Sequence, residues 1–132
     1  MESREVVLVD TSVFIDFFRG KKPPTFEELL LNDQIILSNF VRLELLQGVR
    51  KSEADQLKYV LEGIQNQVFQ IEAFETAESI LERIRGTGMT VGIVDLLIAA
   101  EANIYQCPIY SHDKVFEELF RRRLIPSLWL YK

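Results

Sequence analysis

The sequence predicts an α/β fold: a three-layer α/β/α sandwich with a central, mainly parallel sheet of four to five strands. Short apolar runs alternate with amphipathic segments along the 132 residues, a pattern typical of parallel sheets with helices on both faces. The run Val6–Val9 contains only valine and leucine, which indicates a strand covered on both faces. No linker is long enough to separate domains, so we expect one domain over residues 1–132.

The first half of the chain is expected to provide two strands and four helices. The strands are Val6–Val9 and Ile35–Leu37. The helices span residues 11–18, 25–31, 38–47 and 53–64. A proline pair at residues 23–24 suits the entry to the second helix, because proline is favoured in a first turn. Ser38 is suited to cap the third helix and Gly48 to end it.

The second half is expected to add three strands and three helices. The strands are Val68–Ile71, Pro108–Tyr110 and Ser127–Tyr131. The helices span residues 74–85, 93–103 and 112–122. Gly86 and Gly88 end the first of these helices. The second is apolar and rich in alanine, which indicates a buried helix.

The composition excludes several classes of protein. Hydrophobic residues make up 48% and charged residues 27% of the chain, as in ordinary globular proteins and unlike disordered tails. The single cysteine, Cys107, excludes a disulfide framework and fits a reducing cytosol. Neither a signal peptide nor a membrane span is recognisable, so we expect a cytoplasmic protein. The net charge of −5 argues against nucleic-acid binding driven by bulk charge.

Four acidic residues occupy positions where a parallel sheet places its working site. Asp10 follows the first strand, Glu44 lies in the helix after the second, Asp95 begins the buried helix, and Asp113 follows the strand Pro108–Tyr110. The carboxyl ends of parallel strands meet at one edge, so the four side chains are expected to converge. Because like charges repel, a cation is needed, and an all-oxygen set without cysteine or histidine suits Mg²⁺ or Mn²⁺.

Each acid also has a simpler structural explanation. Asp10 and Asp95 could be ordinary helix N-caps, and Asp113 could complement a helix dipole. Glu44 lies among apolar residues, and Arg42, two positions away, points elsewhere on a helix. Glu44 therefore needs a partner from another part of the fold, or it lies on a partly exposed strip.

Four short segments together resemble the motifs of PIN-domain ribonucleases. The segments are Val9–Asp16, Glu44–Gly48, Val94–Ala100 and Ser111–Phe116. Any one of them is a weak signal, but four in order within a β–α alternation are fairly specific. Their order and spacing, and the chain length, resemble the VapC-like toxins of type II toxin–antitoxin pairs, and the resemblance covers essentially the whole chain.

This resemblance implies metal-dependent endonucleolytic cleavage of RNA. It implies Asp10, Asp95 and Asp113 as ligands of Mg²⁺ or Mn²⁺, bound directly or through water, while Glu44 orients the attacking water or completes the outer shell. It also implies a homodimer and a small antitoxin partner. Val115 departs from many relatives, which carry a further acid there, so a second ion would bind weakly or only with substrate.

Several other residues are candidates for supporting roles. Ser12 could hold a carboxylate oxygen or a metal-bound water, or it could be an ordinary first-turn residue, and Ser111 belongs to the fourth motif. Contact with RNA, or with an acidic segment of a protein partner, is expected from Arg19, Lys21, Lys22, Arg121, Arg122 and Arg123. Their simpler explanation is favourable placement near helix C-termini. His112 has no visible partner, so an incidental role is expected.

Two other classes of function compete with the ribonuclease. The first is a catalytically inactive PIN-like domain that binds RNA or protein, which the presence of all four acids disfavours. The second is a phosphoryl-transfer domain of the receiver or haloacid-phosphatase type. The phosphatase pattern needs a second acid two residues after Asp10, where Ser12 stands. A dinucleotide-binding fold is excluded because no glycine-rich turn follows the first strand.

Overall fold

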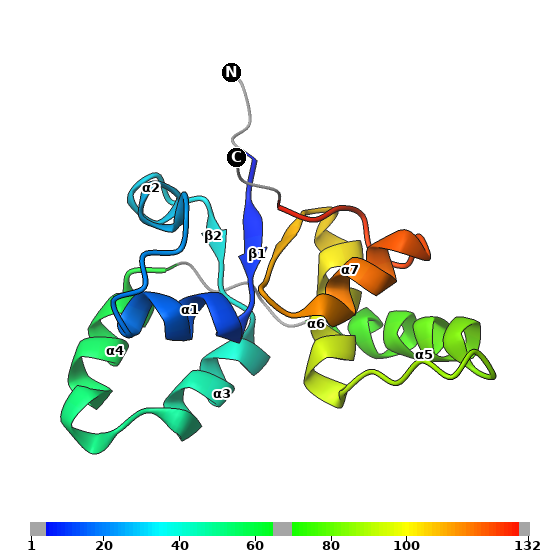
Figure 1. Ribbon diagram of the computed structural model, residues 1–132, viewed down its shortest axis with the longest axis horizontal. Coiled ribbons are helices and arrows are strands. Elements are labelled where there is room, and N and C mark those ends of the chain that lie inside the picture. Colours follow the sequence, from blue (N-terminus) through cyan, green and yellow to red (C-terminus); the bar gives the residue numbers. More distant parts are fainter. Residues whose placement is uncertain (1–4, 65–69, 130–132) are drawn as a thin grey trace.

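A computed structural model describes residues 5–64 and 70–129 of the chain, and Figure 1 shows its strands between two groups of helices. The strands are β1 (Val7–Val9), β2 (Ile35–Ile36) and β3 (Ile109–Tyr110). The helices are α1 (Thr11–Phe18), α2 (Phe26–Leu31), α3 (Asn39–Gly48), α4 (Ala54–Glu62), α5 (Glu72–Ile84), α6 (Ile93–Tyr105) and α7 (Lys114–Arg121), with a short 3-10 helix, η1 (Lys51–Glu53).

The sheet is parallel, as predicted, with the strand order β2-β1-β3. Leu8 of β1 pairs with Ile36 on one side and with Ile109 on the other. Val7, Leu8 and Val9 are fully buried, which confirms a central strand covered on both faces. This order brings the carboxyl ends of all three strands, and the residues that follow them, to one edge of the sheet.

The prediction of four to five strands was too high, since the described residues form three. Of the expected last strand, Leu128 makes an isolated parallel bridge to Ile109, and residues 130–132 lie outside the described part. The backbone N–H of Trp129 donates to the Ile109 carbonyl at 2.8 Å. The expected strand Val68–Ile71 lies partly outside the described residues, and its described end, Gln70 and Ile71, forms the turn that enters α5.

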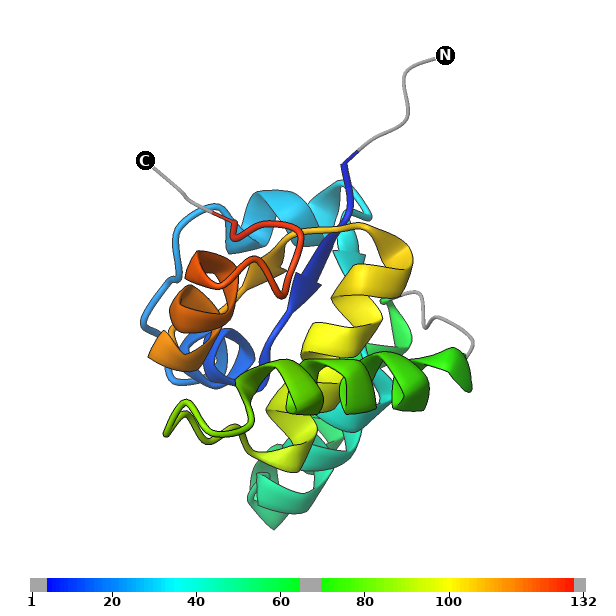
Figure 2. The same cartoon turned by 90° about the vertical axis from the view of Figure 1, so that its right-hand side faces the viewer.

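Helices cover both faces of this sheet. α1 to α4 lie on one side and α5 to α7 on the other, and Figure 2 shows α5 lying across α6 in the second layer. α6 packs on α3, α5 and α7, and its residues from Leu96 to Ala102 are all buried. These contacts confirm the buried, alanine-rich helix. In the described part of the chain, none of the helices has both the length and the apolarity to cross a bilayer.

Helix boundaries follow the capping residues closely. The Ser38 hydroxyl accepts a hydrogen bond from the Phe40 N–H at 3.2 Å, as expected of an N-cap. Gly48 is the last residue of α3 instead of lying beyond it. α6 begins at Ile93 with Gly92 in the N-cap position, so Asp95 lies in the first turn and does not begin the helix. α7 begins at residue 114 instead of 112, because Asp113 caps it.

Candidate carboxylate site at the sheet edge

The candidate site is built where β1 and β3 end. Val9 pairs with Tyr110, so Asp10 and Ser111, the next residue of each strand, are neighbours. The Ser111 hydroxyl donates to Asp10 Oδ2 at 2.7 Å. Parallel pairing therefore brings together two residues that are 101 positions apart in the chain.

Ser12 connects this pair to the loop after β3. Its Oγ lies 3.3 Å from Asp10 Oδ2 and 3.3 Å from Ser111 Oγ. The His112 N–H donates to Ser12 Oγ at 3.0 Å, and the Asp113 N–H donates to Ser111 Oγ at 3.0 Å. Both serines therefore fasten the β3–α7 loop to the start of α1, which is more than an ordinary first-turn role for Ser12.

Asp10 occupies the N-cap position of α1, but its carboxylate makes no capping hydrogen bond there. The side chain turns to the two serines instead, and the residue is only 4% exposed. Burial raises the pKa of Asp10, and the hydrogen bond from Ser111 opposes that rise. The simple capping interpretation is therefore wrong for this residue.

Asp113 is the acid for which the structural explanation holds. It is the N-cap of α7, and its Oδ1 accepts from the Val115 N–H at 3.1 Å. The residue is exposed, so its second carboxylate oxygen is accessible to solvent. A capping role for one oxygen leaves the other available for a ligand.

Glu44 has the partner that its apolar surroundings require. The Thr11 hydroxyl donates to Glu44 Oε1 at 2.6 Å, and the Glu44 residue is half-buried on α3. Thr11 is the first residue of α1 and directly follows Asp10, so the start of this helix places Asp10 next to the residue that binds Glu44. Sequence reasoning missed Thr11, because no local pattern shows which hydroxyl faces a helix 33 residues away.

The pKa of Asp95 is affected by the other three acids. Burial, followed by the negative charges of Asp10, Asp113 and Glu44, raises its pKa to about 6. Asp95 therefore lies close enough to each of the other three carboxyl groups to be repelled by it, and Asp10 is also repelled by Glu44. Within residues 5–64 and 70–129, however, no three His, Cys, Asp or Glu side chains are grouped closely enough to form a metal cage.

The donor chemistry nevertheless fits a hard divalent cation. Carboxylate and hydroxyl oxygens converge on the sheet edge, and the repulsion on Asp95 is the kind that a cation relieves. Mg²⁺ keeps several waters and binds through one or two carboxylates. A closed cage of protein ligands is therefore unnecessary for an ion at this edge.

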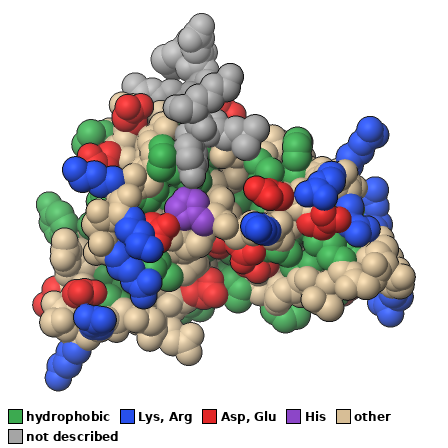
Figure 3. All heavy atoms as spheres, viewed as in Figure 1, with side chains coloured by type: hydrophobic (Ala, Val, Ile, Leu, Met, Phe, Trp, Pro, Cys, Tyr) green, Lys and Arg blue, Asp and Glu red, His purple; other side chains and the backbone are tan. Residues whose placement is uncertain are grey.

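A second feature that the sequence did not indicate is a contact between a histidine and a carboxylate beside the site. His112 Nδ1 lies 2.7 Å from Asp16 Oδ2, and Lys21 Nζ lies 3.7 Å from Asp16 Oδ1. Figure 3 shows acidic side chains around the single histidine, with Lys and Arg side chains over α1. Asp16 thus gives His112 the partner that was not visible in the sequence, and it orients the imidazole ring next to Asp113.

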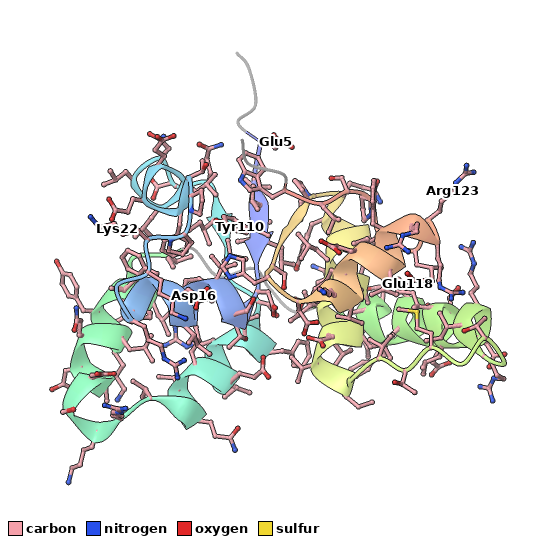
Figure 4. All side chains as sticks on the ribbon, in the orientation of Figure 1. Glu5, Asp16, Lys22, Tyr110, Glu118 and Arg123 are labelled. Carbon is pink, nitrogen blue, oxygen red and sulfur yellow. The ribbon has the colours of Figure 1, made fainter. Side chains whose placement is uncertain are left out.

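The basic residues flank this face at its two ends. Figure 4 shows Lys22 beyond α1 and Arg123 at the far end of α7. Arg121 and Arg122 both pair with Glu118, at 3.1 Å and 2.9 Å. Their intrahelical pairing favours the structural explanation for these two arginines. Arg19 and Lys22 make no ion pair with any described residue.

Comparisons with known proteins agree with this architecture. The sequence profile of the PIN domain matches residues 7–120. The chain is 29% identical over 119 residues to Ribonuclease VapC19 of Mycobacterium tuberculosis (strain CDC 1551 / Oshkosh), covering 85% of this chain and 95% of that protein.

Solved structures with the same fold include the VapBC2 complex of Rickettsia felis bound to a promoter DNA fragment. Its matching chain has a TM-score of 0.73 and 17% identity, over 92% of this chain and 96% of that one. VapBC-1 of nontypeable Haemophilus influenzae gives a TM-score of 0.74 and 17% identity, with the same coverage of both chains.

Proposed function

The chain belongs to the PIN domain family, and from this premise we propose that it is a metal-dependent endoribonuclease, the toxin component of a toxin–antitoxin pair. The observation that carries the proposal is the gathering of Asp10, Asp113 and Glu44 around Asp95, whose pKa is raised by burial and by their negative charges. Carboxyl groups that repel one another are suited to holding a divalent cation, and that cation can in turn attract an anionic phosphodiester.

Asp10, Asp95 and Asp113 are the proposed ligands of Mg²⁺ or Mn²⁺, directly or through water. When bound, such an ion lowers the pKa of water for attack on phosphorus and stabilises the leaving oxygen. Ser111 and Ser12 hold the Asp10 carboxylate in place, and the Val115 N–H holds that of Asp113. Since Val115 itself offers no carboxylate, we propose that one ion binds firmly and a second only with substrate.

Glu44 is proposed to orient the attacking water. The Thr11 hydroxyl occupies Glu44 Oε1, which fixes the carboxylate and leaves Oε2 able to accept a hydrogen bond from water. A fixed acceptor positions the water's proton and lone pair, and such orientation lowers the barrier to reaction. Thr11 is therefore a positioning residue for Glu44.

The proposed partners follow from the relatives. Solved structures of this fold include VapBC toxin–antitoxin complexes, which supports a small antitoxin as the partner of this chain. We also propose that the chain forms a homodimer and that the basic residues Arg19, Lys21 and Lys22 contact RNA. We further propose a cytoplasmic location and a single domain over residues 1–132. One hydrophobic core joins both helical layers, which supports the single domain.

Cleavage of end-labelled total RNA by the purified chain, free of antitoxin, tests this function. Parallel reactions contain Mn²⁺, Mg²⁺ or EDTA, and Asp10→Asn is compared with Glu78→Gln, an exposed acid on α5. We expect discrete products that need the ion, disappear with Asp10→Asn and persist with Glu78→Gln.

The alternative function is a catalytically inactive module that binds RNA or protein. It would be supported if no reaction gave products and Mg²⁺ or Mn²⁺ left the melting temperature unchanged. Products that formed equally in EDTA, or in the Asp10→Asn reaction, would contradict the carboxylate site and indicate a contaminating nuclease.

A further inference from the structure

A pocket of about 330 Å³ opens beside Glu44, between α1, α3 and the segment from η1 to α4. Glu44 belongs both to this pocket and to the candidate site, where Thr11 holds one of its oxygens. The pocket therefore shares the Glu44 side chain with the place where we propose that RNA is cut. Its volume lies at the lower end of the range of small-ligand sites, about 300–1,000 Å³.

The inner wall of the pocket is apolar and its rim is charged. Ile15, Phe18, Leu45 and Leu57 provide the wall. Arg19, at the end of α1, and Arg50, before η1, lie on the rim, and both are exposed. Neither arginine makes an ion pair with any described residue, so both guanidinium groups are available to an anionic ligand.

Hydrogen-bonding side chains complete the rim. Glu53 and Gln56, both exposed, belong to η1 and α4. A carboxylate accepts hydrogen bonds only, and a side-chain amide both donates and accepts. These two groups match the polar edge of a nucleobase, while the apolar wall matches its faces.

We propose that this pocket is a subsite for one unpaired nucleotide of the RNA substrate, on one side of the bond that is cut. The base lies against Ile15 and Phe18, and its flanking phosphates are bound by Arg19 and Arg50. This subsite rests on the proposed ribonuclease function and adds to it a source of sequence preference.

The chemistry of single-stranded RNA favours this occupant. Proteins read RNA sequence mainly from unpaired bases, which stack on aromatic side chains and are hydrogen-bonded along their edges. Two arginines without an acidic partner complement phosphates, whereas a purely apolar protein segment would leave both unsatisfied. Position next to Glu44 sets the bound nucleotide adjacent to the scissile phosphate.

Gly48 provides a way to fill the pocket without disturbing the core. It lines the pocket, a Cβ added there meets no atom within 4 Å, and its backbone is helical. Gly48→Phe therefore occupies pocket space at little cost in folding. Ser79→Phe, on the exposed side of α5, is the matched control, and Arg50→Glu is matched by Arg83→Glu.

The test uses a pool of 12-nucleotide RNAs with randomised central positions, and the cleavage products are sequenced. For the unaltered chain we expect a base preference at one position flanking the cut. Gly48→Phe is expected to abolish that preference and to lower kcat/KM on the order of tenfold, the size of one lost stacking contact. Arg50→Glu is expected to raise KM, and both control variants to behave as the unaltered chain.

Cleavage with an unchanged base preference in Gly48→Phe and an unchanged KM in Arg50→Glu would overturn the subsite while leaving the ribonuclease intact. So would variants that cleave normally but lose binding to a co-expressed antitoxin, because the pocket would then be a protein docking site. If the unaltered chain cuts no RNA, the ribonuclease proposal fails by itself. Titration with nucleoside monophosphates, followed by amide NMR, then decides the subsite: shifts at residues 45–50 support it, and their absence contradicts it.

Discussion

At the scale of single residues, Asp95 is the acid whose protonation is most changed by the fold. It lies in the first turn of α6, and burial together with three neighbouring carboxylates raises its pKa to about 6. At neutral pH the negative charge on Asp95 is therefore less favourable in the folded, metal-free protein than in the unfolded chain, and it lowers the stability of the fold. A cation that relieves this repulsion stabilises the fold as well as the reaction site.

Asp95→Asn is expected to stabilise the metal-free protein and to remove RNA cleavage. A folded-state pKa above the unfolded value means that Asp95 costs stability at pH 7, and this cost vanishes below about pH 4. The melting temperature in EDTA should rise by about 4 °C for each kcal/mol of destabilisation by the buried, repelled carboxylate that the substitution removes. Differential scanning calorimetry checks this, with Asp55→Asn on the exposed side of α4 as the control. A lower melting temperature than that of the unaltered protein would show that the charged Asp95 side chain does not destabilise the metal-free fold.

His112 shows how a residue's role depends on a contact that is distant in the chain. In the sequence it is a lone loop histidine, but Asp16 of α1 lies 2.7 Å from its Nδ1. The contact with Asp16 therefore fixes the orientation of a histidine that the sequence alone gave no role.

At the scale of elements, a buried hydrogen bond joins the two helices that carry Glu44 and Asp95. The Ser38 hydroxyl, at the start of α3, donates to Glu101 Oε1 of α6 at 2.6 Å. Glu101 is 3% exposed, and burial raises its pKa while Ser38 opposes the rise. The bond ties the helices together, but it leaves a carboxyl group that resists ionisation inside the core.

Glu101→Gln is expected to raise the melting temperature at neutral pH and to flatten its dependence on pH. Because the folded pKa lies above the unfolded one, Glu101 contributes its full stability below about pH 4.5 and loses it as pH rises through the folded value. Glutamine accepts the same hydrogen bond from Ser38 without a charge. Thermal melts between pH 4 and pH 9 check this, with Glu78→Gln as the control. A variant less stable than the unaltered protein at pH 8 would show that the charged form is favoured there.

At the scale of the whole molecule, the parallel order β2-β1-β3 is what assembles the site. It sets the ends of β1 and β3 side by side and delivers α3 and α6 to the same edge, from opposite layers of the sandwich. The acids thus come from four separate segments of the chain. A site spread over both layers links ion binding to the stability of the entire fold.

Mg²⁺ is therefore expected to stabilise the unaltered protein by mass action and so to raise its melting temperature. At a Mg²⁺ concentration of a hundred times Kd, the free energy of unfolding should rise by about 2.7 kcal/mol. Asp10→Asn should reduce the shift strongly, because Asp10 is the most buried of the four acids. A scan of Mg²⁺ concentration checks this, with NaCl at matched ionic strength as the control. An equal shift in both proteins would place the ion elsewhere on the molecule.

Local signals in the sequence determined the elements and the family. A few neighbouring residues were enough to predict the valine-rich β1, the Ser38 cap and the alanine-rich α6. The four motifs that indicated a PIN domain are equally local. These patterns depend on backbone propensity and burial, which short segments carry by themselves. Strand number was less secure, because a strand is defined by pairing with a neighbour and not by its own composition: of the expected strand Ser127–Tyr131, Leu128 makes only an isolated bridge to Ile109.

Only the tertiary structure decided which side chains meet. Thr11 with Glu44, Ser38 with Glu101, and Asp16 with His112 are contacts between segments distant in the chain. The different roles of two acids were also decided only there: Asp10 is hydrogen-bonded to the serines, whereas Asp113 caps α7. Such contacts depend on strand order and helix rotation, which arise from packing the whole chain around one core, and no local pattern of residues encodes them.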